Sequence, residues 1–141
     1  MRLQESLAPS ESADTPDKVA GYIRPLLLTS LRYNQDVENL GIVFMNTRRR
    51  PIGMEIISNG TLDTLLVHPR EVFKPAIVIG AAAIVIFHNH PSGDPCPSEA
   101  DIKVTRDMIR AGQLLKIDVL DHIILGDGKH SSLRELGYFY S

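Results

Sequence analysis

The sequence predicts an α/β layered domain with a mixed, mostly antiparallel sheet flanked by helices. The chain has 141 residues, a typical length for one domain, and 43% hydrophobic and 23% charged residues, as in ordinary globular proteins. Segments with helical spacing of apolar residues alternate irregularly with short apolar runs, in the order α, β, β, short β, α, β, α, β and without an internal repeat. This order favours a layered α/β domain over a regular βαβ series.

The first elements follow a polar N-terminal segment. Residues 1–15 are rich in Ser, Pro, Asp and Glu, so we expect a flexible arm there and a single domain over residues 16–141. Thr15 before Pro16 is typical of a helix start. Apolar residues then recur at helical spacing: Val19, Ile23, Leu26 and Leu27. Pro25 should kink or shorten this helix.

Two strands and an edge segment are expected next. The mostly apolar run 40–45 predicts a largely buried strand. A turn over 47–51 leads to a second strand over 52–58, which we expect to pair antiparallel with the first. Asn59-Gly60 is typical of a turn, and 62–67 of a short strand or extended edge.

Two further helices are expected. The segment 68–71 resembles a helix start. One face of this helix would carry Val72, Phe73, Ala76 and Ile77. Ser98 begins the other helix, and Gly112 should soften its last turns. Its apolar positions at helical spacing are Ile102, Met108, Ile109, Leu114 and Leu115.

The remaining strands surround that last helix in sequence. Residues 83–87 predict a compact apolar strand, and 117–125 predict another. Gly126-Asp127-Gly128 is typical of a tight hairpin turn. Residues 131–137 form the closing segment.

Charge and cysteine content exclude several classes of protein. Lys and Arg total 15 against 17 Asp and Glu, a net charge of -2, so there is no global basic excess for nucleic acid, although Arg48, Arg49 and Arg50 form a local group. The single cysteine excludes disulfides and zinc sites made of several thiolates. No run reaches the ~18 apolar residues of a membrane span, and the N-terminus lacks a signal-peptide pattern. We expect a cytoplasmic protein without a membrane partner.

The most informative residues lie between the strand over 83–87 and the helix that follows. His88 and His90 are two residues apart, so a strand would direct both imidazoles to one face. The loop over 91–97 can return the chain so that Asp101, in the first turn of the next helix, reaches the same point. Two imidazoles and one carboxylate leave a fourth position for water, which is typical of a catalytic zinc site.

Each of these residues also has a simpler interpretation. A histidine on a strand is more often a hydrogen-bonded residue than a metal ligand, and Ser98 with Asp101 forms a capping-box pattern. Ser92-Gly93-Asp94-Pro95 is typical of a turn without function. The pattern of zinc nucleobase deaminases is excluded because no second cysteine follows Cys96, which we interpret as a bystander.

The motif His-x-His, seven residues, Ser, two residues, Asp resembles the JAB/MPN (JAMM) superfamily of metal-dependent peptidases. The neighbouring sequences resemble its RadC family: His68-Pro69-Arg70-Glu71-Val72, His88 to Gly93, and Leu120-Asp121-His122. The resemblance covers about residues 31–140 and implies a JAB/MPN-like fold with cytidine-deaminase-like layering. The helix-hairpin-helix region that usually precedes this domain is missing, so direct DNA binding is not expected.

The resemblance also implies roles for residues. Zn²⁺ would be held by His88, His90 and Asp101. Glu38, just before the strand over 40–45, would act as general base toward zinc-activated water, with Glu55 as the competing candidate. Ser98 would hydrogen-bond the oxyanion formed as an amide or isopeptide of a peptide or protein substrate is attacked. Without the resemblance, a solvated carboxylate is the simpler interpretation of Glu38.

Other functions stay open at this point. The alternative from another class is an interaction module in DNA repair or recombination, with a structural or silent metal site. Metal-dependent phosphoester cleavage is a weaker third possibility. Ser92, Asp121 and His122 have no assigned role, although Asp121 or His122 could orient a metal ligand. Exposed edge strands make a homodimer plausible.

Overall fold

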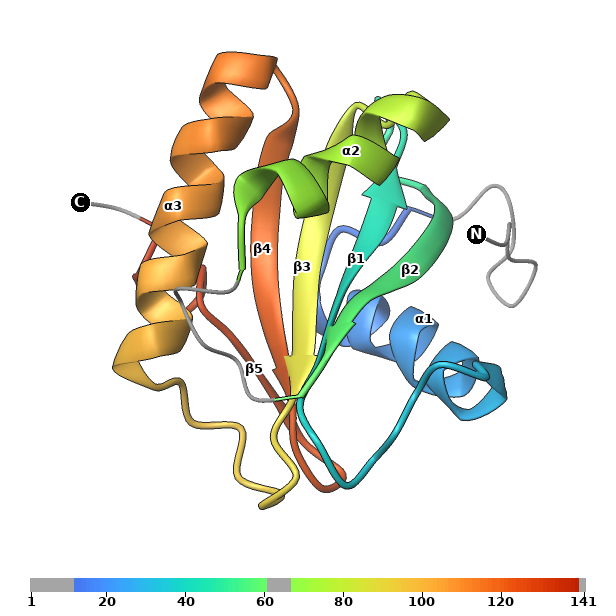
Figure 1. The fold of residues 1–141 in the computed structure, drawn as a ribbon, viewed down its shortest axis with the longest axis vertical. Helices are drawn as coiled ribbons and strands as arrows, with labels where there is room; N and C mark the ends of the chain where they lie inside the picture. The colour runs from blue at the N-terminus through green and yellow to red at the C-terminus, as the bar shows by residue number, and fades with distance from the viewer. Residues whose placement is uncertain (1–11, 61–66, 140–141) are drawn as a thin grey trace.

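The computed structural model describes residues 12–60 and 67–139. Over these residues the chain forms a five-stranded sheet in the order β2-β1-β3-β4-β5, with three helices packed on it (Figure 1). The elements are α1 (Pro16–Thr29), β1 (Asn39–Met45), β2 (Pro51–Asn59), α2 (Pro69–Ile79), β3 (Ala83–Asn89), α3 (Glu99–Leu115), β4 (Asp118–Leu125) and β5 (His130–Ser132). The predicted α/β layered fold is confirmed.

The strand pairing is mixed and mostly antiparallel, as predicted. β1 pairs antiparallel with both β2 and β3, and β4 pairs antiparallel with β5 across the expected hairpin. The parallel pair is β3 with β4, which α3 connects as a crossover. The short edge predicted over 62–67 lies outside the described residues except for Val67, which is not in a strand.

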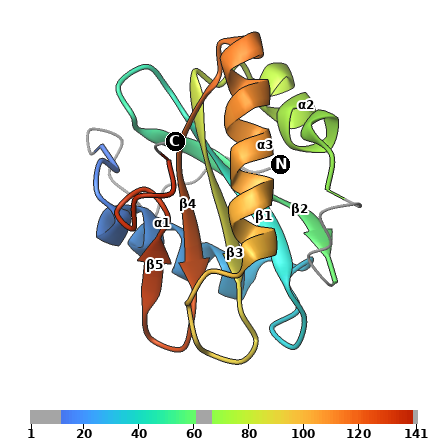
Figure 2. The same cartoon turned by 90° about the vertical axis from the view of Figure 1, so that its left-hand side faces the viewer.

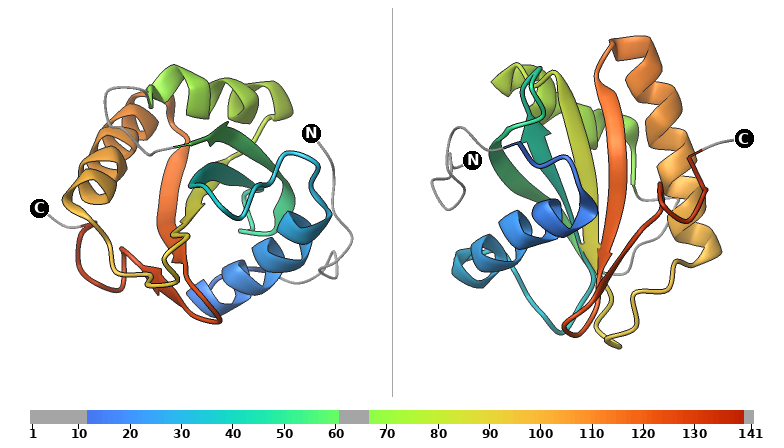
Figure 3. Two further views of the ribbon diagram at one scale, coloured as in Figure 1. Left: turned by 60° about the horizontal axis from the view of Figure 1, so that its bottom comes forward. Right: turned by 180° about the vertical axis from the view of Figure 1, so that it is seen from behind.

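The two faces of the sheet are covered by different helices. Figures 2 and 3 show α2 and α3 on one face, the α3 face, and α1 on the opposite one, the α1 face. Alternation along β1 divides its side chains between two apolar cores. Leu40, Ile42 and Phe44 pack with α2 and α3, whereas Val43 and Met45 pack with α1.

The first helix begins where the sequence predicts. The Thr15 hydroxyl accepts a hydrogen bond from the Lys18 amide (3.2 Å), and Pro16 occupies the first turn. Pro25 does not shorten the helix, which continues to Thr29. Leu26 and Leu27 are buried beyond the proline, and this packing offsets the lost backbone hydrogen bond. Residues 1–11 of the expected arm lie outside the described residues; Ala13 is buried, and its amide donates to the Arg49 carbonyl.

The buried stripes of the other two helices differ from the apolar pattern of their sequences. Ile77 of α2 is 57% exposed, and Leu114 and Leu115 of α3 are 85% and 45% exposed. The buried stripe of α3 instead contains Asp101, Val104, Thr105, Met108 and Gly112. A Cβ on Gly112 would lie 2.4 Å from the Ile117 carbonyl oxygen, so this glycine allows close packing of helix and chain rather than softening the helix.

None of the helices in the described ranges is both long enough and apolar enough to span a bilayer.

Candidate metal centre

The two histidines of the motif are held by the end of a central strand. His88 is the penultimate residue of β3 and is completely buried. His90 follows the strand, and its amide still donates to the Leu125 carbonyl on β4 (2.9 Å), which keeps the backbone in register. The two imidazoles therefore leave the chain in the same direction, as the spacing of two residues predicts.

The loop after His90 returns the chain to the same place. The Gly93 amide donates to the His90 carbonyl, and the Gly93 carbonyl accepts from the Asp127 amide of the β4–β5 hairpin (2.8 Å). α3 then begins after Ser98, whose hydroxyl accepts from the Asp101 amide (3.1 Å) while its own amide donates to Asp101 Oδ2 (2.8 Å). This capping box fixes the Asp101 carboxylate in the first turn of the helix.

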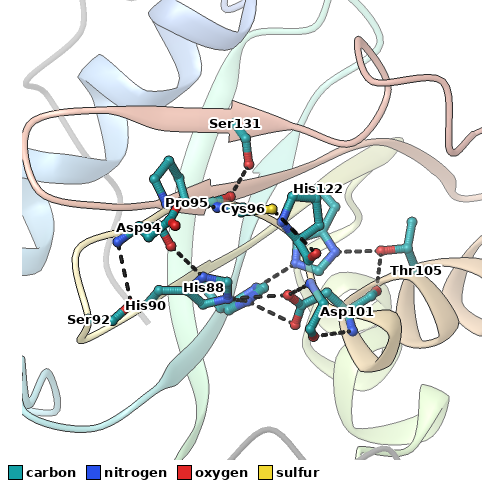
Figure 4. A network of polar contacts seen from close by, with 12 residues as sticks. His88, His90, Ser92, Asp94, Pro95, Cys96, Asp101, Thr105, His122 and Ser131 are labelled. Atoms are coloured by element: carbon teal, nitrogen blue, oxygen red, sulfur yellow. Dashed lines mark hydrogen bonds and ion pairs between the residues drawn. The ribbon is translucent and has the colours of Figure 1, made fainter.

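The side chains of three candidate ligands, His88, His90 and Asp101, converge at this point (Figure 4). His88 Nε2 lies 2.9 Å from His90 Nε2 and 3.1 Å from Asp101 Oδ1, and His90 Nε2 lies 3.2 Å from Asp101 Oδ2. Ligand atoms of a tetrahedral zinc ion are separated by about 3.3 Å when the zinc–nitrogen distance is about 2.0 Å. The donor set therefore has the size and chemistry of a site for a divalent metal ion such as zinc.

The protons on the two rings also fit a cation. His90 Nδ1 lies 2.8 Å from the Asp94 carbonyl oxygen, which can only accept, so Nδ1 carries the proton and a neutral His90 has a lone pair on Nε2. His88 has the same arrangement: its Nδ1 faces His122 Nε2 (2.7 Å), and its Nε2 faces the other two side chains. Two lone pairs 2.9 Å apart beside a carboxylate repel one another unless a proton or a metal ion lies between them.

The Asp101 carboxylate is negative at neutral pH. Burial alone would raise the pKa of this carboxyl. In the metal-free site, hydrogen bonding and charge from a His88 ring that carries a proton where a metal ion would bind, together with the hydrogen bonds of Ser98, hold the pKa well below its usual range. A buried carboxylate that stays ionised can serve, together with two neutral imidazoles, as a ligand of a divalent cation such as zinc.

His122 and Thr105 lie directly behind these ligands. The sequence left open that His122 or Asp121 orients a metal ligand, and it assigned no role to Thr105. His88 Nδ1 is 2.7 Å from His122 Nε2, and His122 Nδ1 is 2.5 Å from Thr105 Oγ1. Thr105 in turn donates to the Asp101 carbonyl (2.8 Å). A signal was present: Asp101 and Thr105 are four residues apart, so two polar residues share the buried face of α3.

Asp121 belongs to the α1 face and does not touch the ligands. Its Oδ1 accepts from the His122 and Arg134 amides, and its Oδ2 accepts from the Ser132 hydroxyl (2.5 Å). Burial raises its pKa, partly offset by the Ser132 hydrogen bond. Asp121 therefore ties β4 to β5 and the turn that follows, and the carboxylate does not orient His122.

The two candidate general bases lie in different places. Glu38 is half-buried just before β1, and its carbonyl accepts from the Gly60 amide (2.8 Å). The antiparallel pairing of β1 with β3 ends at Leu40 with His88, and Glu38 stands two residues before Leu40, so the same register extended by two residues would bring Glu38 opposite His90. Glu55 is on β2, where it pairs with Ile42 of β1. It lines a separate groove with Arg32, Glu71 and Lys74.

Two asparagines fix the segment that carries Glu38, and sequence reasoning missed both. Asn89 Oδ1 accepts from the Asn39 amide (2.7 Å) and from its Nδ2 (3.0 Å), and Asn89 Nδ2 donates to the Val37 carbonyl (3.0 Å). Asn39 Nδ2 also donates to the carbonyls of Val37 and Asn34. The residue between the two histidines therefore anchors both neighbours of Glu38.

The other residues of the loop have local roles. The Ser98 side chain is exposed beside the ligands. Ser92 Oγ accepts a long hydrogen bond from the Asp94 amide (3.4 Å), and the Asp94 carboxylate accepts from the Cys96 amide (3.0 Å). Cys96 is exposed, and its sulfur is 3.9 Å from the Pro97 carbonyl. Asp94 contributes to the centre through its backbone carbonyl on His90.

Comparisons with known proteins agree with this geometry. Residues 13–138 match the family model described as RadC-like JAB domain. The chain is 52% identical over 120 residues to a UPF0758 protein of Moorella thermoacetica, 49% over 114 residues to one of Caldanaerobacter subterraneus, and 40% over 137 residues to one of Symbiobacterium thermophilum. These alignments cover 85%, 81% and 96% of this chain but 50%, 48% and 56% of the relatives, so the chain spans about half their length. With a match over nearly its whole length and the two histidines and aspartate of the motif gathered at one point, the chain belongs to the RadC family of JAB domains.

Proposed function

We propose that this domain is a zinc-dependent hydrolase that cleaves a peptide or isopeptide bond. The observation that carries the proposal is the convergence of His88 Nε2, His90 Nε2 and a carboxylate oxygen of Asp101 within 4.8 Å of one another. Three such ligands leave a fourth position for water or substrate, the arrangement of catalytic rather than structural zinc. Zinc bound by these residues would polarise a substrate carbonyl and lower the pKa of water from about 15.7 toward ~7.

Glu38 is the general base in this proposal. Its place beside His90 in the register supports the assignment, and the hydrogen bonds of Asn89 and Asn39 fix the backbone on both sides of it. The Glu38 carboxylate would accept a proton from the attacking water and return it to the leaving amine. Glu55 is disfavoured because it lies over the groove beside α2.

Ser98 is the proposed oxyanion donor. Its hydroxyl oxygen accepts from the Asp101 amide, which leaves the hydroxyl proton for donation, and the side chain is exposed to an incoming substrate. A hydrogen bond to the developing oxyanion contributes roughly 3 kcal/mol to transition-state stabilisation in other acyl-transfer enzymes. The helix cap thus supports both Asp101 and the substrate oxygen.

Metal analysis and a cleavage screen test the proposal together. Purified chain should contain about one zinc per molecule and cleave members of a peptide or isopeptide library. Glu38→Gln should keep the zinc and lose cleavage, whereas the matched variant Glu55→Gln should keep both. A chain that binds no divalent metal after zinc reconstitution contradicts the metal site, and a Glu38→Gln variant that cleaves like the wild type contradicts the assigned base.

A further inference from the structure

We infer that Thr105 and His122 are positioning residues that fix the ring protons of His88 so that its Nε2 atom is free to bind a metal. The inference rests on the proposed metal site and extends it to residues that touch neither metal nor substrate. Its starting point is a continuous chain of contacts from His88 through His122 and Thr105 to the backbone of Asp101. All four residues are buried.

The direction of each hydrogen bond follows from the last one. The Asp101 carbonyl oxygen can only accept, so the Thr105 hydroxyl donates its single proton there (2.8 Å). Thr105 Oγ1 can then only accept from His122, which places a proton on His122 Nδ1. The threonine hydroxyl therefore selects one tautomer of a histidine that lies on another element of the fold.

The protons of His88 follow in the same way. His122 is completely buried between His88 and Thr105, with no carboxylate of the described residues hydrogen-bonded to its ring, and burial disfavours the charged form of an imidazole, so we take the ring as neutral. With its proton on Nδ1, His122 Nε2 is an acceptor and takes the Nδ1 proton of His88 (2.7 Å). His88 Nε2 is left with a lone pair that faces Asp101 and His90.

The contacts also form a closed ring, because the side chains of His88 and Asp101, at the two ends of the chain of hydrogen bonds, contact each other (3.1 Å). It leaves His88 on β3, passes through β4 and α3, and ends on the backbone of Asp101, the third ligand. A shift of α3 would therefore disturb His88 and Asp101 together. Outer hydrogen bonds of this kind typically change metal affinity by about 10–100-fold when they are lost.

The experiment compares two substitutions at Thr105 in the full chain, with zinc alone as the probe. Thr105→Val has nearly the same shape but no hydroxyl, and we expect zinc affinity to fall about 10–100-fold. Thr105→Ser restores the hydroxyl and should bind zinc within a few-fold of the wild type. Ser132→Ala, which removes a buried hydroxyl on the α1 face, should leave zinc affinity unchanged. Melting temperatures of the metal-free variants separate loss of affinity from loss of fold.

Nitrogen-15 NMR of the histidine rings gives a readout that a general packing role would not produce. In the zinc-loaded wild type, His88, His90 and His122 should all carry their ring proton on Nδ1, and His122 should be neutral. A proton on Nε2 of His122, or wild-type zinc affinity in folded Thr105→Val, overturns the inference. Neither measurement uses a substrate, so a chain that binds zinc but cleaves nothing would refute the hydrolase proposal and leave this inference intact.

Discussion

The strands bury polar side chains on both the α3 face and the α1 face of the sheet, and the groups around His88 and around Asn89 are satisfied differently. On the α1 face, Asn39, Asn89 and Asp121 have donors matched to acceptors within the protein. On the α3 face, His88 and Asp101 meet His90 with lone pairs directed at a common point. The first pattern stabilises the fold without a ligand, whereas the second is compatible with a bound metal ion.

The strand β3 supplies residues to both patterns. His88 points to the α3 face, and its neighbour Asn89 pairs with Asn39 on the α1 face. Alternation along one strand therefore lets two adjacent residues serve separate purposes: one is a proposed metal ligand, and the other holds the segment of the proposed base. The comparison teaches that the buried polar group to suspect of function is the one whose partners cannot satisfy it by hydrogen bonding alone.

The largest expected difference is between the two buried aspartates. Asp101→Asn removes the charged ligand, and we expect zinc affinity to fall more than the about 100-fold upper range for loss of an outer hydrogen bond. Asp121→Asn, on the α1 face, should leave zinc affinity unchanged. Isothermal titration of both variants with zinc measures the contrast, and equal losses in the two would show that the faces are not functionally distinct.

The second prediction concerns the anchor of the Glu38 segment. Asn89→Ala removes three hydrogen bonds and leaves the Asn39 amide and the Val37 carbonyl without these partners. Because a displacement of about 1 Å in a catalytic group can cost 100-fold in rate, we expect cleavage to fall by up to about that factor while zinc content is retained. Peptide cleavage rates and metal analysis on the same preparations measure both effects.

Two controls separate positioning from general damage. Asn89→Asp keeps the acceptor for Asn39 and loses the donor to the Val37 carbonyl, so its cleavage rate should lie between those of Asn89→Ala and the wild type. Ser92→Ala alters an exposed residue of the neighbouring loop and should have no effect. Loss of zinc from Asn89→Ala would contradict the separation of roles along β3.

Sequence reasoning predicted three residues that the structure brings together, but of the residues behind them it named only His122, as one of two that could orient a ligand, and the reason is physical. The His-x-His spacing and the helix cap at Ser98 are local geometry, so the sequence predicts where these side chains point. The contact between His122 and Thr105 joins β4 to α3 and depends on tertiary packing. Glu38 was assigned by resemblance, and its role stays a prediction.

The apolar pattern of α3 shows the same limit. Leu114 and Leu115 keep helical spacing but are exposed, whereas Asp101 and Thr105 occupy the buried face. The spacing of apolar residues alone therefore predicts the wrong buried face at the end of this helix. Polar residues are tolerated in the buried face when each of them has a hydrogen-bond partner. At the start of the helix, the polar residues of the buried stripe mark the site.

The smallest expected effect is a pH dependence of stability that belongs to the α1 face. Burial raises the pKa of Asp121 above the ordinary value of 3.8, so the folded protein holds this proton at a pH where the unfolded chain has released it. The contribution of Asp121 to the free energy of unfolding should therefore fall as pH rises from about 3.8 to the folded pKa, and then stay constant. Urea unfolding of wild type and Asp121→Asn, both metal-free and across this pH range, isolates the effect because the other titrating groups cancel in the difference. A wild-type advantage that grows with pH would instead mean that the three hydrogen bonds to Asp121 outweigh its burial and lower its pKa in the folded protein.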